Sequence, residues 1–167
     1  MHNELTEKDI QLMREELDDR RIRLRPLLLE EVKTARAFGD LSENFEYKAA
    51  KRDKNRNESR IRYLENMIET AIIVETDSRE GVIGLFDRVK IYYPEDDEYR
   101  EIRLVTTLRN DVFKDCISQD SPFGKALMGK RVGQTVTVHV NANVSYPVKI
   151  LEVIKGEDDP DLPISTY

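Results

Sequence analysis

Two long stretches with helical spacing, separated by a break at Gly39, constrain the fold of this 167-residue chain more than any other feature. Within residues 6–37, and again within residues 42–70, apolar side chains recur every three or four positions, which places them on one face of a helix. A connection of about four residues is typical of antiparallel helices, because so short a loop leaves the second helix beside the first. We therefore predict a helical hairpin with residues 39–44 at its tip.

Local signals refine the predicted hairpin. Thr6 can accept a hydrogen bond from the first helical turn, so we predict that it is the N-cap. Pro26 lacks a backbone N–H and crowds the preceding turn, which predicts a kink or a helix restart near Arg25. Lys54 and Asn57 occupy heptad positions that are otherwise apolar. We therefore expect a polar middle in the seam between the helices and looser packing in its distal half.

In the second half of the chain the apolar period becomes two, which indicates strands. Ser121 can cap a short helix, Pro122 fits the first turn of that helix, and Gly129 stands where the helix would end. A slip of the alternation at Leu151 predicts a β-bulge, and Pro147 predicts an edge or a distortion in the same strand. Antiparallel strands are expected at residues 89–93, 100–106, 136–140 and 144–153.

These patterns predict an α+β protein with two domains. Residues 1–76 would form an antiparallel coiled coil, and residues 81–156 would form an antiparallel sheet with one short helix. The boundary falls in a polar stretch that ends in glycine, as is typical of a linker. Residues 157–167 are expected to be a mobile acidic tail.

The composition excludes several functional classes. A net charge of −6 argues against non-specific binding of duplex DNA as the main activity. A single cysteine, Cys116, excludes an internal disulfide framework and favours a reducing compartment, and two histidines are too few for a Cys/His zinc cluster. No run of about eighteen apolar residues occurs, so we expect no membrane contact and a cytoplasmic location.

Asp40 and Glu43 are the candidate functional residues, because these two carboxylates lie at the predicted tip, far from any predicted core. One interpretation is a helix cap in which Asp40 accepts a hydrogen bond from the backbone N–H of Glu43; Ser42 could cap the helix as well. The other interpretation is a metal site, because Mg²⁺ prefers a few carboxylates together with water. The spacing of the residues, taken alone, favours the cap.

Basic residues follow the tip along the second predicted helix. Such a run is common on a solvated helix face, and it also fits contact with phosphate groups. Phe45 and Tyr47 could stack on bases, although Tyr47 also has the spacing of a seam residue. The basic residues are Lys48, Lys51, Arg52, Lys54, Arg56, Arg60 and Arg62.

Two sets of residues carry a family resemblance. The tip set is Gly39-Asp40-Leu41-Ser42-Glu43-Asn44, followed by Glu46-Tyr47 and Ala50-Lys51. The C-terminal set is Ile117-Ser118, Ser121-Pro122, Ala126-Leu127, Gly129-Lys130 and Gly133. In order and spacing they resemble the two motifs of the bacterial Gre transcript cleavage factors, GreA more closely than GreB. Phe45 departs from this pattern, because the family often has alanine there.

The resemblance implies a fold and an activity. The fold would be an antiparallel coiled coil followed by a domain similar to FK506-binding proteins. Factors of this family bind RNA polymerase at the rim of its secondary channel, insert the coiled coil, and stimulate the polymerase's own cleavage of backtracked RNA at its 3′ end; they are not enzymes themselves. By this resemblance Asp40 and Glu43 would help to hold a second Mg²⁺ in the polymerase complex, and Ser121 and Pro122 would belong to the polymerase-binding surface. The residues expected to contact RNA or polymerase from the hairpin are Lys48, Lys51, Arg52 and Arg56.

Three alternatives stay open at this point. A channel-binding paralogue could modulate or inhibit the polymerase without promoting cleavage. A peptidyl-prolyl isomerase built on the second domain would need an aromatic-lined pocket, whereas the chain has no tryptophan and only 7% aromatic residues. A homo-oligomeric coiled coil is disfavoured by the polar middle of the seam, so we expect a monomer.

Overall fold

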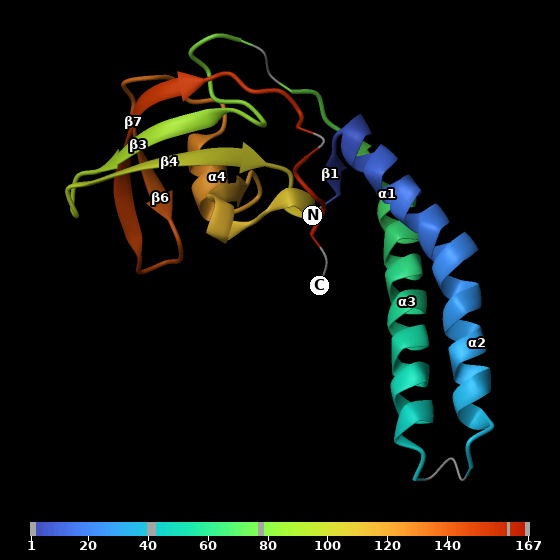
Figure 1. Cartoon of the computed structure of the whole chain (residues 1–167). Coiled ribbons are helices and arrows are strands. Elements are labelled where there is room, and N and C mark those ends of the chain that lie inside the picture. The colour runs from blue at the N-terminus through green and yellow to red at the C-terminus, as the bar shows by residue number, and fades with distance from the viewer. Residues whose placement is uncertain (1–2, 40–42, 77–78, 160, 166–167) are drawn as a thin grey trace. The chain divides into compact units, whose positions relative to one another are not determined.

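The computed structural model describes residues 3–39, 43–76, 79–159 and 161–165, and these residues form two compact units (Figure 1). The hairpin unit is Ile10–Ala71. The sheet unit consists of the described residues up to Asp9 and from Ile72 onward. The predicted α+β class, with a helical hairpin followed by a sheet and a short helix, is confirmed.

The hairpin unit is helical along both arms. The first arm contains α1 (Glu7–Asp19), a π-helical segment (Arg20–Leu24) and α2 (Arg25–Arg36), and the second arm is α3 (Phe45–Thr70). The backbone N–H of Arg25 donates to the carbonyl of Arg20, five residues earlier, so the irregular turn lies directly before Pro26. The predicted helix restart at Arg25 is confirmed, whereas α3 begins at Phe45, later than the expected start at residue 42.

The two arms pack through apolar side chains near the base of the hairpin and through fewer of them towards its tip. Leu28 and Ala35 are the buried residues of α2, and both face α3 from the distal half. This distribution agrees with the expected looser distal seam, because burial of apolar surface is what stabilises a helix pair. Buried near the base are Met13, Leu17, Ile61, Leu64 and Met67.

A polar layer crosses the middle of the seam and confirms the predicted polar character of that region. Buried Asn57 accepts a hydrogen bond from Arg20 Nη1 at 3.0 Å and donates to the Arg20 carbonyl at 3.3 Å. Glu16 accepts from Arg20 Nε at 2.7 Å and from Arg60 Nε at 2.9 Å. Burial raises the pKa of Glu16, but the hydrogen bonds from Arg60 and Arg20 outweigh burial and hold this pKa below its ordinary range. Arg60, expected on the basic face, is therefore buried in the seam instead.

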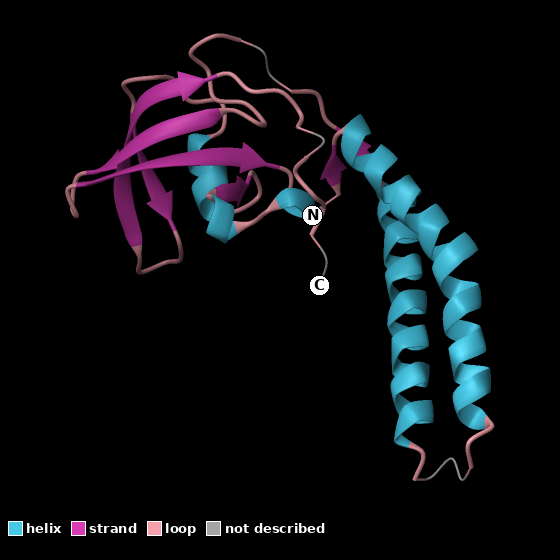
Figure 2. Cartoon of the chain, in the orientation of Figure 1, coloured by secondary structure: helices cyan, strands magenta, loops and turns pink. Residues whose placement is uncertain are grey.

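The sheet unit contains a mixed sheet, whose strands are magenta in Figure 2 and follow the order β5-β4-β3-β7-β6. The hairpin pairs β3–β4 and β6–β7 are antiparallel as predicted, and β3–β7 is antiparallel too. β5 runs parallel to β4, so the expectation of a wholly antiparallel sheet is wrong. Its strands are β3 (Arg88–Tyr93), β4 (Glu98–Val105), β5 (Cys116–Ser118), β6 (Thr135–His139) and β7 (Ser145–Ile154). The connection from β4 to β5 makes short 3₁₀ turns, after which β5 pairs with the last three residues of β4. Three residues are too few for β5 to show an alternating pattern in the sequence.

The irregularity predicted for the last strand is present in β7. The register between β3 and β7 shifts between Lys90 and Ile91, which leaves Leu151 without a partner on β3 and confirms the bulge. Pro147 lies where β7 pairs with β6 but not with β3. Its missing N–H therefore interrupts no ladder on the β3 side, which is why proline is tolerated there.

The core of the sheet unit lies between the sheet and α4 (Pro122–Leu127). Leu127 is the residue of α4 that is fully buried in this core. A separate short parallel pair, β1 (Glu4–Leu5) with β2 (Ile72–Ile73), lies in the same unit. The core residues are Ile83, Val89, Ile91, Ile102, Leu104, Leu127, Val138, Val148 and Ile150.

A buried charge cluster, which we call the Arg109 cluster, joins the first turn of α1 to residues beyond β7. Arg109 Nε donates to Asp9 Oδ1 at 2.6 Å, and Arg109 Nη1 lies 2.6 Å from Asp158 Oδ1. Thr6 Oγ1 donates to Asp158 Oδ2 at 2.7 Å and accepts from the Asp9 N–H at 3.2 Å, which confirms Thr6 as the N-cap. Asp158, expected in a mobile tail, is instead held by these contacts.

Candidate functional site at the hairpin tip

The side chain of Asn44 connects the described residues on the two sides of the tip. Asn44 Oδ1 accepts from the Tyr47 N–H at 2.9 Å and is thereby the N-cap of α3. Its Nδ2 donates to the carbonyl of Ala35 at 2.7 Å, near the end of α2. Gly39 has φ of 133°, a conformation that side-chain-bearing residues rarely adopt. One asparagine side chain therefore satisfies backbone groups of both helix ends, and glycine permits the turn between them.

Of the two acidic residues at the tip, Glu43 lies within the described residues and Asp40 does not. Glu43 lies in the turn before α3, and its side chain is exposed. Asp40 and Ser42 lie outside the described residues, so their expected roles stay predictions. In a capping box the acidic residue is the third residue of the helix. Glu43 instead precedes the N-cap Asn44, so the capping-box interpretation does not account for Glu43. An exposed carboxylate oxygen is a donor of the kind that Mg²⁺ accepts.

Cations and aromatic rings alternate beside the tip, in what we call the basic-aromatic cluster: Arg36, Phe45, Tyr47, Lys48 and Lys51. Lys48 Nζ lies 5.8 Å from the centre of the Phe45 ring, which is largely exposed. Arg36 Cζ and Lys51 Nζ lie 5.5 Å and 6.0 Å from the centre of the Tyr47 ring. A hydrogen bond from Arg36 lowers the pKa of Tyr47. These positions place positive charge next to ring faces, a combination that suits phosphate groups and unpaired bases.

The predicted RNA or polymerase contacts of α3 are all exposed. Lys48, Arg52 and Arg56 follow one another at intervals of four residues, so they lie on one face of the helix. Arg52 has Asp53 4.0 Å away, an exposed pair that contributes little stability. Lys51 lies one position before Arg52 and extends the face towards Tyr47. The structure thus presents a continuous basic face behind the tip.

In the sheet unit, Ser121 and Pro122 form the start of α4. Ser121 Oγ accepts from the Gly124 N–H at 3.0 Å, which confirms the predicted cap, and donates to the Ser118 carbonyl at 2.7 Å. Pro122 is exposed in the first turn. A Cβ on Gly124 would lie 2.1 Å from the Ser118 oxygen, so the close approach of α4 to β5 requires glycine. Ser121 therefore fixes the position at which the Pro122 ring is exposed.

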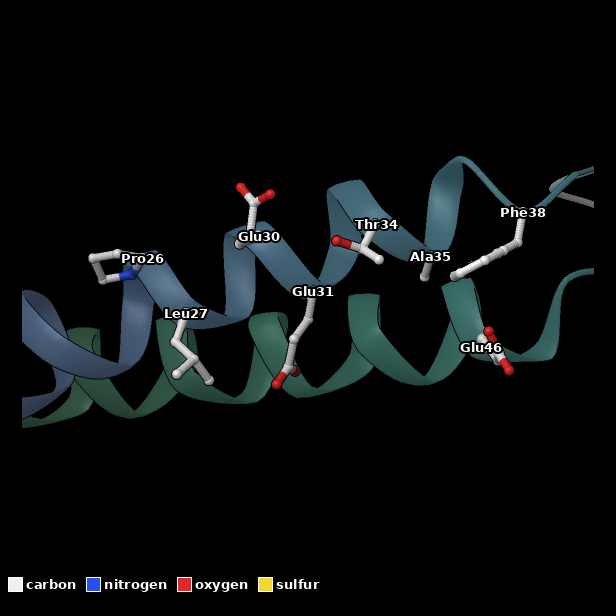
Figure 3. A pocket seen from close by; sticks show the side chains of 8 residues that line it. All are labelled: Pro26, Leu27, Glu30, Glu31, Thr34, Ala35, Phe38 and Glu46. Carbon is white, nitrogen blue, oxygen red and sulfur yellow. The ribbon is translucent and has the colours of Figure 1, made fainter.

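Sequence reasoning missed a shallow groove along α2, which Figure 3 shows. The spacing left open whether Leu27 or Leu28 belongs to the seam. Leu28 is 8% exposed and Leu27 is 49% exposed, so Leu28 belongs to the seam and Leu27 to the surface. The available signal was the surplus of apolar residues in the first arm, more than one seam can bury. The groove, of about 640 Å³, is lined by Pro26, Leu27, Glu30, Glu31, Thr34, Ala35, Phe38 and Glu46.

Within the described part of the chain, no helix is both long enough and apolar enough to cross a membrane.

Two family matches together span nearly the whole chain. Residues 3–73 match the family described as "Transcription elongation factor, N-terminal". Residues 78–155 match the family described as "Transcription elongation factor, GreA/GreB, C-term". The boundary between the two matches falls in the polar stretch where the sequence predicted a linker.

Individual relatives agree with these matches. Transcription elongation factor GreA of Mesoplasma florum is 38% identical over 89% of this chain and 96% of its own length. Transcription elongation factor GreA of Bacillus velezensis is 40% identical over 89% of this chain and 94% of its own length. Among solved structures, GreA factor homolog 1 (Gfh1) of Thermus thermophilus is 27% identical, with 93% of this chain and 100% of that chain covered and a TM-score of 0.43.

Proposed function

The chain belongs to the GreA/GreB family of transcription elongation factors, and from this premise we propose that it binds RNA polymerase at the rim of the secondary channel and stimulates the polymerase's own cleavage of backtracked RNA. The hairpin unit enters the channel, and the sheet unit binds at the rim. The chain acts on the polymerase and is not itself a nuclease. The observation that carries this proposal is the hairpin tip, where exposed Glu43 adjoins the basic-aromatic cluster.

The length of the hairpin supports the proposed reach. α3 contains 26 residues, which corresponds to about 39 Å at a rise of about 1.5 Å per residue. Two helices of this length stay paired only if they bury a seam along their whole course. Where apolar burial is reduced, the polar layer around Asn57 supplies specific hydrogen bonds between them. The tip can therefore act at about this distance from the base of the hairpin.

Asp40 and Glu43 are the proposed ligands that the tip contributes to the polymerase. Their carboxylate oxygens are the donor type that Mg²⁺ prefers. A second Mg²⁺ held jointly with the polymerase would complete a two-metal site, in which one ion activates water and the other stabilises the leaving oxygen of the phosphodiester. Glu43 is exposed and precedes the cap of α3, so formation of the helix leaves its carboxylate directed to solvent rather than to a backbone N–H of that helix. These two residues bind and orient; the reaction belongs to the polymerase.

The basic face behind the tip is the proposed contact for the 3′ end of backtracked RNA and the adjoining channel wall. Lys48, Lys51, Arg52 and Arg56 neutralise phosphate charge. Phe45 and Tyr47 offer ring faces on which an unpaired base can stack, a contact typically worth about 1–3 kcal/mol per base. The bulky Phe45, which replaces the alanine common in the family, adds such a face directly beside Glu43.

At the rim of the channel, Ser121 and Pro122 are the proposed contacts of the sheet unit with the polymerase. Ser121 orders the start of α4 through its two hydrogen bonds, and Pro122 presents a rigid apolar ring at the surface. A rigid, exposed ring loses little conformational entropy on binding. The pair therefore suits a docking surface better than a flexible loop would.

The decisive experiment adds the chain to a halted, backtracked RNA polymerase that carries end-labelled RNA. We expect the wild-type chain to accelerate cleavage, and Asp40→Ala or Glu43→Gln to lower the rate on the order of a hundredfold, because each removes a charge that acts in the transition state. Glu69→Gln, an exposed carboxylate elsewhere on α3, is the matched control and should cleave like wild type. Reactions without polymerase should show no cleavage.

Equal rates for the wild-type chain and the tip variants would exclude the carboxylate role. Binding of the wild-type chain without faster cleavage would instead identify a paralogue that modulates or inhibits the polymerase.

A further inference from the structure

The acidic-rimmed groove along α2 has a composition unlike that of the basic face. The close-up in Figure 3 shows Leu27 and Phe38 at its two ends, while Glu30 and Glu31 point away from α2 in different directions. Glu46, at the start of α3, completes the rim. An apolar floor is thus bordered by carboxylates.

The apolar residues of this groove are not used by the hairpin itself. Leu27 is 49% exposed and Phe38 is 71% exposed, whereas neighbouring Leu28 and Ala35 already fill the seam. Single exposed apolar residues are common, but Leu27 and Phe38 line the same groove on an otherwise charged rod, which suits contact with a partner. Covering Leu27 and Phe38 would remove their apolar surface from water, which favours association.

The charge of the rim selects the class of partner. Glu30 and its neighbour Lys33, 3.8 Å away, are both largely exposed, so this ion pair neutralises the rim only weakly. Carboxylates at this density repel phosphate groups, so RNA suits the basic face and not this groove. The complementary occupant is a polypeptide segment that offers an apolar side chain together with lysine or arginine.

The groove lies next to the tip, on the part of the hairpin that would enter the secondary channel. It follows α2 from Pro26 to Arg36, about 15 Å at about 1.5 Å per residue, and continues to Phe38 just before the tip. Successive helical residues are rotated by about 100°, so Glu46 of the groove and Tyr47 of the basic-aromatic cluster lie on different sides of α3. A hairpin whose tip reaches the polymerase active centre would therefore have this groove inside the channel, facing away from the RNA contacts.

We propose that the acidic-rimmed groove receives a segment of RNA polymerase inside the secondary channel, in which an apolar side chain is flanked by lysine or arginine. This inference rests on the proposed function and adds a second, protein-directed face to the hairpin. Two faces of opposite character fix the rotation of the hairpin about its long axis. That rotation decides whether Glu43 is directed towards the polymerase metal site, so the groove positions the tip without touching the reacting atoms.

The first test replaces Leu27 with the photoreactive residue p-benzoylphenylalanine in the full chain bound to backtracked polymerase. We expect cross-links to a polymerase peptide that contains an apolar residue beside lysine or arginine. The same residue placed at Arg62, an exposed position on the basal half of α3, should give no cross-link to that peptide. Cross-links from position 27 to RNA, or to a second copy of this chain, would each overturn the proposal.

The second test measures polymerase affinity by competition with fluorescent wild-type chain. The triple variant Glu30→Gln, Glu31→Gln and Glu46→Gln should bind about tenfold more weakly, because it removes three rim charges that would pair with lysine or arginine of the partner. Its affinity should also depend less on salt. Phe38→Ala should weaken binding by a similar factor at all salt concentrations. The control, Glu15→Gln with Glu69→Gln and Glu75→Gln, removes the same charge from exposed positions outside the groove and should bind like wild type.

The outcomes separate the two proposals when RNA cleavage is measured in the same complexes. If the wild-type chain binds and stimulates cleavage while the triple variant and Phe38→Ala both match it in affinity, only the groove proposal fails. If the wild-type chain neither binds nor stimulates cleavage, the proposed function fails and the groove proposal with it. Weaker binding by both groove variants, with the expected cross-link, supports the groove.

Discussion

Replacing Asp9 with alanine is expected to destabilise the sheet unit by about 3–5 kcal/mol, because it leaves the buried guanidinium of Arg109 without its fully buried carboxylate partner. Both side chains are 0% exposed, and Arg109 Nε lies 2.6 Å from Asp9 Oδ1. Water therefore cannot replace the lost partner without opening the structure. The Thr6 N–H, which donates to Asp9 Oδ2 at 3.1 Å, also loses its acceptor, and this adds about 1 kcal/mol.

Asp158 provides the internal comparison for this prediction. Its side chain is 19% exposed, so water reaches the position when the carboxylate is removed, and Asp9 still balances the charge of Arg109. Asp158→Ala should therefore cost only about 1–2 kcal/mol. Replacing Asp9 and Arg109 together with leucine removes both charges and should recover part of the loss seen with Asp9→Ala, because a buried pair costs desolvation that apolar residues do not.

The assay is urea denaturation followed by tyrosine fluorescence and by circular dichroism, with the free energy of unfolding extrapolated to water. Asp18→Ala, which removes an exposed carboxylate from the same helix, is the control and should change stability by less than about 0.5 kcal/mol. A loss below about 1 kcal/mol for Asp9→Ala would refute the reasoning that the buried guanidinium depends on this partner. So would equal losses for Asp9→Ala and Asp158→Ala.

Three further predictions concern the hairpin and α4. Asn44→Ala should lower the stability of the hairpin unit by about 1–2 kcal/mol in thermal denaturation, because it removes the α3 cap and the hydrogen bond to the end of α2; an unchanged melting temperature would contradict this role. Gly124→Ala should cost about 1–3 kcal/mol in urea denaturation, because the added Cβ would lie 2.1 Å from the Ser118 oxygen. The hairpin unit should lose stability as pH falls below the ordinary glutamate pKa of about 4.3, because the pKa of Glu16 is lowered in the folded state and protons therefore bind the unfolded state more readily. Glu16→Gln should abolish that part of the acid dependence, and an unchanged pH profile in this variant would show that other groups cause it.

The sequence by itself determined the features that arise from neighbouring residues. The helical period, the break at Gly39, the caps at Thr6 and Ser121 and the bulge at Leu151 all follow from local backbone geometry, which each residue type imposes within one or two turns. The basic face of α3 belongs to the same class, because its spacing of four residues is visible in the chain. For that reason the hairpin is predictable from the sequence, whereas the proposed metal role of its tip comes from the family resemblance.

Only the tertiary structure decided which charged and apolar residues are buried. Arg60 has the spacing and charge of a surface residue, yet it pairs with Glu16 across the seam. Arg109 is buried because Asp9, 100 residues earlier in the chain, lies against it. Burial of an ion depends on a partner brought close by the fold, and such a partner leaves no local period in the sequence.

The same reason explains the parallel strand β5 and the groove along α2. The pairing of β5 with β4 depends on how the connection of residues 106–115 returns, and the groove depends on which of two adjacent leucines turns towards α3. The residue types of each segment determine whether it forms a helix, a strand or a turn, because backbone preference and periodicity act over short distances. The packing of distant segments determines which faces stay exposed and can bind partners, because a surface is covered only when folding brings another segment against it.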